Sequence, residues 1–157
     1  YVRYLDVLFD RPDDIMSMVN NGRFQLTRMD LNGLNPSGVA LSPGMFSAVG
    51  NSARLDFGVN GLGGNRNTTA GDGYYELGVD MDGNGSFESK KYFYRLLGDV
   101  NGDRKVDSTD SSLVTSAFGT TNPDRDVNGD GTVNANDRTL VLRSIGRKLK
   151  DDLFADD

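Results

Sequence analysis

The sequence predicts a mainly β protein with a small α-helical part at its C-terminal end. Three observations support this fold class. Twenty glycines and 36% hydrophobic residues in a chain of 157 favour short elements joined by turns. Apolar and polar residues alternate in several short segments of the first 97 residues. A longer segment, residues 99–119, then recurs as residues 126–146, and each copy ends in a helical pattern.

Residues 1–97 are expected to form an antiparallel, immunoglobulin-like β-sandwich. The first strand pattern is VRYLDVLF, residues 2–9, in which Leu5, Val7 and Phe9 fall on one face. Similar patterns follow, separated by breaks rich in Gly, Asn or Pro, at residues 22–31, 53–59, 73–80 and 91–97. Strands that recur in this way, without a long helical period, are typical of a sandwich of about 100 residues. The expected core is Leu5, Val7, Phe9, Phe24, Leu26, Leu55, Phe57, Val59, Tyr75, Leu77, Val79 and Phe93.

The composition excludes several classes of function. The chain has no cysteine and no histidine, so it has neither disulfides nor thiolate nucleophiles, and it lacks the usual zinc ligands and the usual general base near neutral pH. No spacing of carboxylates suggests an acid and a base facing each other in a cleft, so we expect no enzyme. A net charge of −6 argues against a nucleic-acid partner.

Two features concern the setting of the chain. No apolar run approaches the roughly 20 residues of a membrane span, so we expect no membrane insertion. Neither an initiator methionine nor a signal peptide precedes Tyr1, so we expect a fragment of a larger protein.

The two copies of the repeat are predicted to be calcium-binding loops. They are identical at 10 of 21 positions, and both open with DVNGD. Oxygen-bearing side chains occupy loop positions 1, 3, 5, 9 and 12, and position 7 contributes a backbone carbonyl. The first loop uses Asp99, Asn101, Asp103, Lys105, Asp107 and Asp110, and the second uses Asp126, Asn128, Asp130, Thr132, Asn134 and Asp137. Calcium prefers six to eight oxygen ligands, and a 12-residue loop supplies them at these spacings.

A helix is expected after each loop, because Leu113, Val114 and their counterparts in the second copy recur at helical spacing. No helix is expected before either loop. Val106 and Val133, at position 8, are expected to pair with each other as a short strand. Since the segment is small and its carboxylates repel one another, calcium binding should be coupled to its folding. A chelator should then reduce the helical signal and leave the sandwich largely unaffected.

Residues 80–91, DMDGNGSFESKK, allow two interpretations. Oxygen-bearing side chains stand at positions 1, 3, 5, 7 and 9 of a similar loop, and these are Asp80, Asp82, Asn84, Ser86 and Glu88. Position 12 is Lys91, which cannot bind a cation. The Asp-Gly and Asn-Gly pairs favour a simple hairpin turn, and a third calcium site is the alternative.

Two tandem loop–helix motifs, each opening with DVNGD, resemble a type I dockerin. The resemblance covers residues 98–150. It implies a secreted bacterial module in which calcium orders two F-hand motifs, a variant of the EF-hand without its entering helix, whose helices dock on a cohesin domain of another protein. Residues 1–97 more loosely resemble the immunoglobulin-like modules that precede dockerin-like tails in large bacterial extracellular proteins. Residues 151–157 are expected to form an acidic tail, in which Leu153 and Phe154, with Leu149, either fold back on Leu96 and Leu97 or stay disordered.

The two copies depart from the dockerin pattern in different ways. Loop position 6 normally requires glycine at positive φ. Gly131 provides it in the second copy, whereas Arg104 in the first should cost about 1 kcal/mol. Dockerins often carry a Ser-Thr pair at positions 10 and 11 that contacts the cohesin. Ser108 and Thr109 match this pair, and Ala135 and Asn136 do not.

The sequence therefore predicts a noncatalytic, calcium-binding interaction module with a β-sandwich spacer. It would dock a larger extracellular protein onto a cohesin-like partner or another cell-surface component. The alternative is a carbohydrate-binding or adhesive β-sandwich on which the calcium domain is a structural cap.

Overall fold

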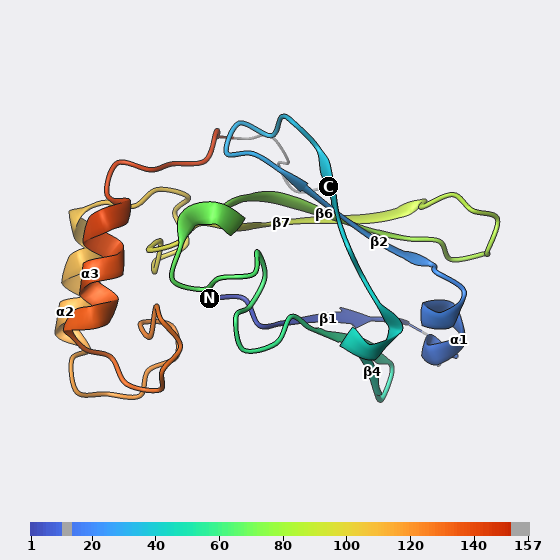
Figure 1. Cartoon of the computed structure of the whole chain (residues 1–157), viewed down its shortest axis with the longest axis horizontal. Coiled ribbons are helices and arrows are strands. Elements are labelled where there is room, and N and C mark those ends of the chain that lie inside the picture. The colour runs from blue at the N-terminus through green and yellow to red at the C-terminus, as the bar shows by residue number, and fades with distance from the viewer. Residues whose placement is uncertain (11–13, 152–157) are drawn as a thin grey trace.

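Residues 1–97 are built around two antiparallel sheets in the computed structural model, which describes residues 1–10 and 14–151 (Figure 1). We refer to residues 1–97 as the β region and to residues 98–150 as the loop–helix region. The three-stranded sheet has the order β1–β5–β4, with β1 Tyr4–Leu8, β4 Phe46–Val49 and β5 Ser52–Asp56. The four-stranded sheet has the order β3–β2–β6–β7, with β2 Phe24–Met29, β3 Ser37–Val39, β6 Gly73–Val79 and β7 Ser89–Arg95.

The two sheets contribute to shared hydrophobic clusters. In one cluster Phe9 and Ala53, from the side of the three-stranded sheet, pack with Phe24 and Val79 of the four-stranded sheet. In a second cluster the buried residues Leu26, Leu62, Tyr75 and Leu77 pack with partly buried residues of β1. The chain is thus mainly antiparallel β with few helices, as predicted.

Five of the seven strands coincide with predicted segments. The sequence did not indicate β3, β4 or the short helix α1 (Ile15–Asn20), because the two strands span only three and four residues and the helix is less than two turns long. Two 3₁₀ turns, Pro43–Met45 and Thr69–Gly71, complete the β region.

One predicted core residue is wrong. Val59 is 67% exposed, because β5 ends at Asp56 and Gly58 turns the chain at a φ of 72°. Leu62, which the alternating pattern did not include, is 1% exposed and belongs to the core instead.

The loop–helix region contains α2 (Ser108–Ser116) and α3 (Ala135–Ser144), which lie side by side (Figure 1). A helix continues from each loop, as predicted, and its first residue is loop position 10. Both begin with a capping box, in which the residue at loop position 9 and the residue at loop position 12 exchange hydrogen bonds with the backbone of the first turn.

The predicted pairing between Val106 and Val133 is wrong. The N–H of Val106 donates to the carbonyl of Arg147 at 2.9 Å, and the N–H of Val133 donates to the carbonyl of Thr120 at 2.8 Å. Each valine therefore pairs with the chain that follows the helix of the other copy. This exchange satisfies the buried backbone of each loop while the valine side chains enter the core.

A third hydrophobic cluster joins the two regions. Tyr74, Leu96 and Leu97 of the β region lie in it together with Leu149 and the valines of the loop–helix region. Leu149 thus lies in the same cluster as Leu96 and Leu97, the two residues that follow β7. Leu153 and Phe154 lie outside the described residues, as does most of the expected acidic tail.

Candidate calcium centre

The first loop folds around the carboxylates at its two ends. Asp99 accepts hydrogen bonds from the N–H groups of Gly102 and Arg104, at 2.8 and 3.0 Å. Asp110 is fully buried and accepts from the N–H groups of Val100 and Asp107, at 2.9 and 2.8 Å. The last predicted ligand thus ties the start of the loop to the first turn of α2.

The second loop repeats this arrangement. Asp126 accepts from the N–H groups of Asp130 and Gly131, at 3.1 and 2.8 Å. Asp137 is fully buried and accepts from the N–H groups of Asn128 and Asn134, at 3.0 and 2.8 Å. The predicted ligands at positions 3 and 5 follow one pattern in both loops, in which each side chain accepts from the N–H two residues later.

Position 6 has positive φ in both loops. The value is 93° at Gly131 and 68° at Arg104. The expectation that Arg104 occupies the left-handed region is confirmed, and a residue with a Cβ is strained there.

The two loops differ in charge at position 7. The ammonium group of Lys105 lies 3.0 Å from Asp107 and 3.6 Å from Asp103, whereas the second loop has Thr132. The N–H of Thr109 and the Lys105 ammonium lower the pKa of Asp107 to about 2. Lys105 is exposed and Asp107 is only partly buried, so solvent screens the pair. A metal that used Asp103 and Asp107 would compete with Lys105.

The donor set fits a hard cation. Every predicted side-chain ligand is a carboxylate or amide oxygen, which suits calcium. In the described part of the chain no Lys or Arg forms an ion pair with Asp110 or Asp137, although both are fully buried. A buried carboxylate without a cationic partner is costly, and a bound Ca²⁺ would offset that cost.

The segment between β6 and β7 joins these two antiparallel strands as a hairpin. It carries the same side-chain–backbone pattern as the two loops. Asp80 accepts from the N–H groups of Gly83 and Gly85, at 2.6 and 2.9 Å. Glu88 accepts from the N–H of Met81 at 2.8 Å, as Asp110 does from the second residue of its loop.

The carboxylates of this turn also converge. One oxygen each of Asp80, Asp82 and Glu88 lies within 4.8 Å of the others. Asn84 accepts from the N–H of Ser86 at 2.7 Å, and both side chains are exposed. Spacing along the sequence places Lys91 at position 12 of this turn. It does not show that Glu88 folds back over the start of the turn.

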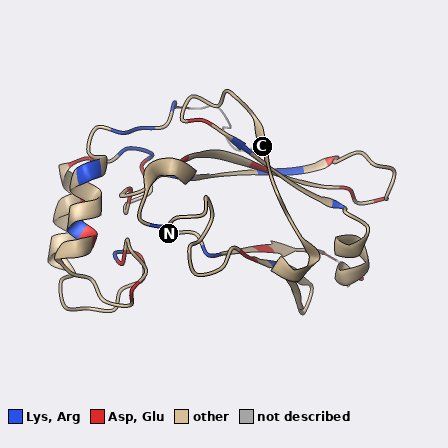
Figure 2. Cartoon of the chain, in the orientation of Figure 1, with Lys and Arg blue, Asp and Glu red and all other residues tan. Residues whose placement is uncertain are grey.

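Acidic residues gather in the loops before α2 and α3 and in the β6–β7 turn (Figure 2). The four predicted partner-binding residues occupy the first turns of the two helices and are all exposed. They are Ser108, Thr109, Ala135 and Asn136. None of the described helices is long and apolar enough to cross a membrane.

Two calcium-type loops, each closed by a capping box and followed by a helix, define the class of the site. Residues 97–146 match the family model of the dockerin type I domain. This match supports a type I dockerin domain in that third of the chain. No curated protein and no solved structure shows significant similarity to the chain.

Proposed function

We propose that residues 98–150 form a noncatalytic, calcium-dependent dockerin domain that docks a larger extracellular bacterial protein onto a cohesin-like partner. Residues 1–97 serve as an immunoglobulin-like β-sandwich spacer, and residues 151–157 are an acidic tail. The observation that carries the proposal is the repeated loop. Two copies keep the same ligand spacing, the same buried last carboxylate and the same capping box within the segment that matches the dockerin family.

Two calcium ions are expected. The first would be held by Asp99, Asn101, Asp103, Asp107, Asp110 and the carbonyl of Lys105. The second would be held by Asp126, Asn128, Asp130, Asn134, Asp137 and the carbonyl of Thr132. Bound calcium would neutralise these carboxylates and stabilise the helices that begin at the last ligand of each loop.

Docking would use the helices that the loops position. Ser108 and Thr109 are positions 10 and 11 of the first loop and form the exposed first turn of α2, so they are available to a partner. Ala135 and Asn136 hold the equivalent places on α3 and present different chemistry. The alternative is a carbohydrate-binding β region. Tyr74 and Tyr75 on β6 are buried and cannot offer a stacking surface, whereas Tyr92 on β7 is 40% exposed.

The proposal is tested by measuring calcium binding and docking on the same variants. Calorimetric titration of the whole chain should show calcium binding that is lost in the double variant Asp110→Ala/Asp137→Ala. Binding to a panel of purified type I cohesin domains should require calcium and should be lost in the same variant. Asp124→Ala is the matched control, because it removes a carboxylate from the linker between the copies. This variant should bind calcium and cohesin normally.

The number of sites is read from the same titration. Two ions per chain are expected from the dockerin loops. A third ion that is lost in Asp82→Asn would assign a further site to the β6–β7 turn. A chain that binds no calcium would overturn the proposed function.

A further inference from the structure

The junction between the two regions has no flexible linker. Only Leu96, Leu97 and Gly98 separate the end of β7 from Asp99, and the two leucines are buried in the cluster that joins the regions. Gly98 has a φ of 95°, and a side chain there would lie 3.2 Å from the Cα of Val141 on α3. The loop–helix region is therefore packed against the β region, not tethered to it.

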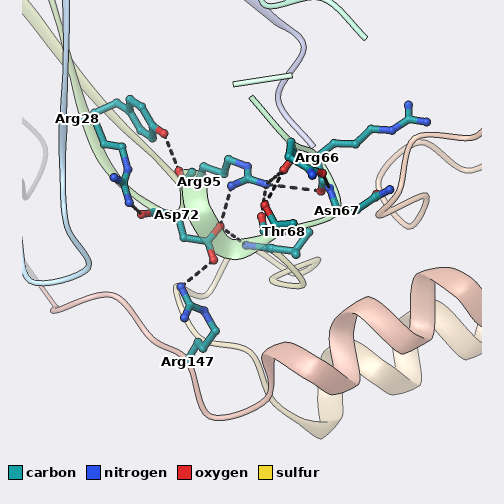
Figure 3. A network of polar contacts seen from close by, with 11 residues as sticks. Arg28, Arg66, Asn67, Thr68, Asp72, Arg95 and Arg147 are labelled. Carbon is teal, nitrogen blue, oxygen red and sulfur yellow. Dashed lines mark hydrogen bonds and ion pairs between the residues drawn. The ribbon is translucent and has the colours of Figure 1, made fainter. Parts of the chain in front are cut away.

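A buried carboxylate connects the end of the β region to the end of the loop–helix region (Figure 3). Asp72 accepts from Arg95 of β7 at 3.1 Å, from Arg147 after α3 at 3.0 Å, and from the N–H of Leu97 at 2.9 Å. Arg95 also donates to carbonyls of the segment before Asp72, including that of Thr68 at 2.8 Å. Burial raises the pKa of Asp72 and lowers that of Arg95, so the network costs desolvation and contributes mainly a defined geometry.

A side chain of the β region also contacts a predicted calcium ligand. The hydroxyl of Tyr94 on β7 donates to Oδ2 of Asp99 at 3.1 Å. The N–H of Arg104 donates to the same oxygen, so Tyr94 and the strained residue of the loop are held by one carboxylate.

The second loop is contacted in a different way. Arg66 of the β region donates to the backbone carbonyl of Gly129 at 2.9 Å, and the ring of Tyr1 covers Gly129 so closely that a Cβ there would lie 2.2 Å from it. The position that corresponds to Tyr94 before the second loop is Thr121, which is exposed. A tyrosine hydroxyl therefore donates to a predicted ligand at the first loop, and the corresponding residue of the second copy is not a tyrosine.

We propose that Tyr94 is a positioning residue for the first calcium site and acts through Asp99. The inference rests on the proposed function, because it requires the first loop to bind calcium. A hydrogen bond from a residue outside the ligand set orients the ligand before the ion arrives and reduces the conformational entropy that binding costs. The β region would in this way raise the calcium affinity of the loop that carries Arg104 at its strained position.

The test compares Tyr94→Phe with Tyr92→Phe in the full chain. Both substitutions remove one hydroxyl from β7 and keep the ring, but Tyr92 donates to Glu76 on β6 at 2.7 Å, away from the loops. Both are made in an Asp137→Asn background, which disables the second loop so that calorimetry reports the first site. We expect Tyr94→Phe to weaken calcium binding about 10-fold, as loss of a partner to a metal ligand commonly does, and Tyr92→Phe to leave it unchanged.

A second measurement separates positioning from general destabilisation. Thermal unfolding in chelator should show similar midpoints for the two phenylalanine variants. In a chain with both loops intact, Tyr94→Phe should leave the affinity of the second site unchanged. Equal calcium affinities in the two variants, or an equal loss at both sites, would overturn the positioning role and leave the proposed function standing. Absence of calcium binding by the unsubstituted chain would overturn both.

Discussion

At the scale of single residues, Arg104 is the clearest difference between two otherwise matched loops. Its backbone makes the contacts that the turn requires, since its N–H donates to Asp99 and its carbonyl accepts from Leu149. These contacts hold φ at 68°, where the Cβ of an arginine is strained. Gly131 makes the equivalent turn without that cost.

Arg104→Gly is therefore expected to raise the free energy of unfolding by about 1 kcal/mol, because glycine relieves the strain and keeps both backbone contacts. Urea unfolding in calcium measures the change. Arg104→Ala is the matched control, since it removes the same charge and keeps the Cβ. Equal stabilisation by glycine and alanine would show that charge, and not backbone conformation, is responsible.

At the scale of elements, each loop and its helix share residues. Asp107 and Asn134 are predicted ligands and also the N-caps of α2 and α3, and the last ligand of each loop is the third helical residue. The loop and the first helical turn therefore form one structural unit. This sharing explains how an ion bound in the loop would order the helix that follows.

Asn134→Ala is expected to destabilise the chain by about 1 kcal/mol even in chelator, because the N–H of Asn136 loses the side-chain oxygen that accepts from it at 2.8 Å. Urea unfolding in chelator isolates this effect from any loss of calcium. Asn136→Ala, an exposed substitution two residues further along α3, should have little effect. The capping role is refuted if the two variants are equally stable.

At the scale of the whole molecule, the β region and the loop–helix region share a core and a buried ion network. Asp72 binds Arg95 within the β region and Arg147 from the end of the loop–helix region. Removal of the Asp72 carboxylate should affect both regions, because the buried guanidinium of Arg95 would lose its partner.

Asp72→Ala is expected to lower the free energy of unfolding by about 3 kcal/mol, measured by urea denaturation. Asp6→Ala is the control, because it breaks a well-formed but exposed ion pair with Arg54, and it should leave the unfolding midpoint nearly unchanged. Similar losses in the two variants would mean that the burial of Asp72 does not matter.

The shared core also argues against the expectation that chelation affects only the helices. Calcium should raise the unfolding temperature of the whole chain, because a cation bound to the loops stabilises a region that is packed against the sheets. Tyrosine near-ultraviolet and helical far-ultraviolet signals should show one transition that shifts with calcium. Two separate transitions, of which only the helical one shifts, would contradict this prediction.

The candidate calcium ligands could be proposed from the sequence because a loop of 12 residues places oxygen donors by local spacing. The same reasoning found both helices, five strands and the positive φ of Arg104. It placed Glu88 at position 9 of a possible third site but did not show that this side chain accepts from the N–H of Met81, because the fold-back depends on the hairpin and not on a regular spacing. It also placed Val59 in the core, since the alternating pattern does not show where a strand ends.

The repeat, its oxygen donors and the absence of histidine and cysteine therefore follow from the order of residues along the chain, because they depend on neighbours only a few positions apart. Three other features depend on three-dimensional packing. They are the pairing of Val106 and Val133 with the end of the other copy, the hydrogen bond from Tyr94 to Asp99, and the ion pair of Asp72 with Arg147. They join residues that are brought together when the sheets and helices bury a common core. No local pattern encodes such contacts, since each partner has an ordinary sequence environment of its own.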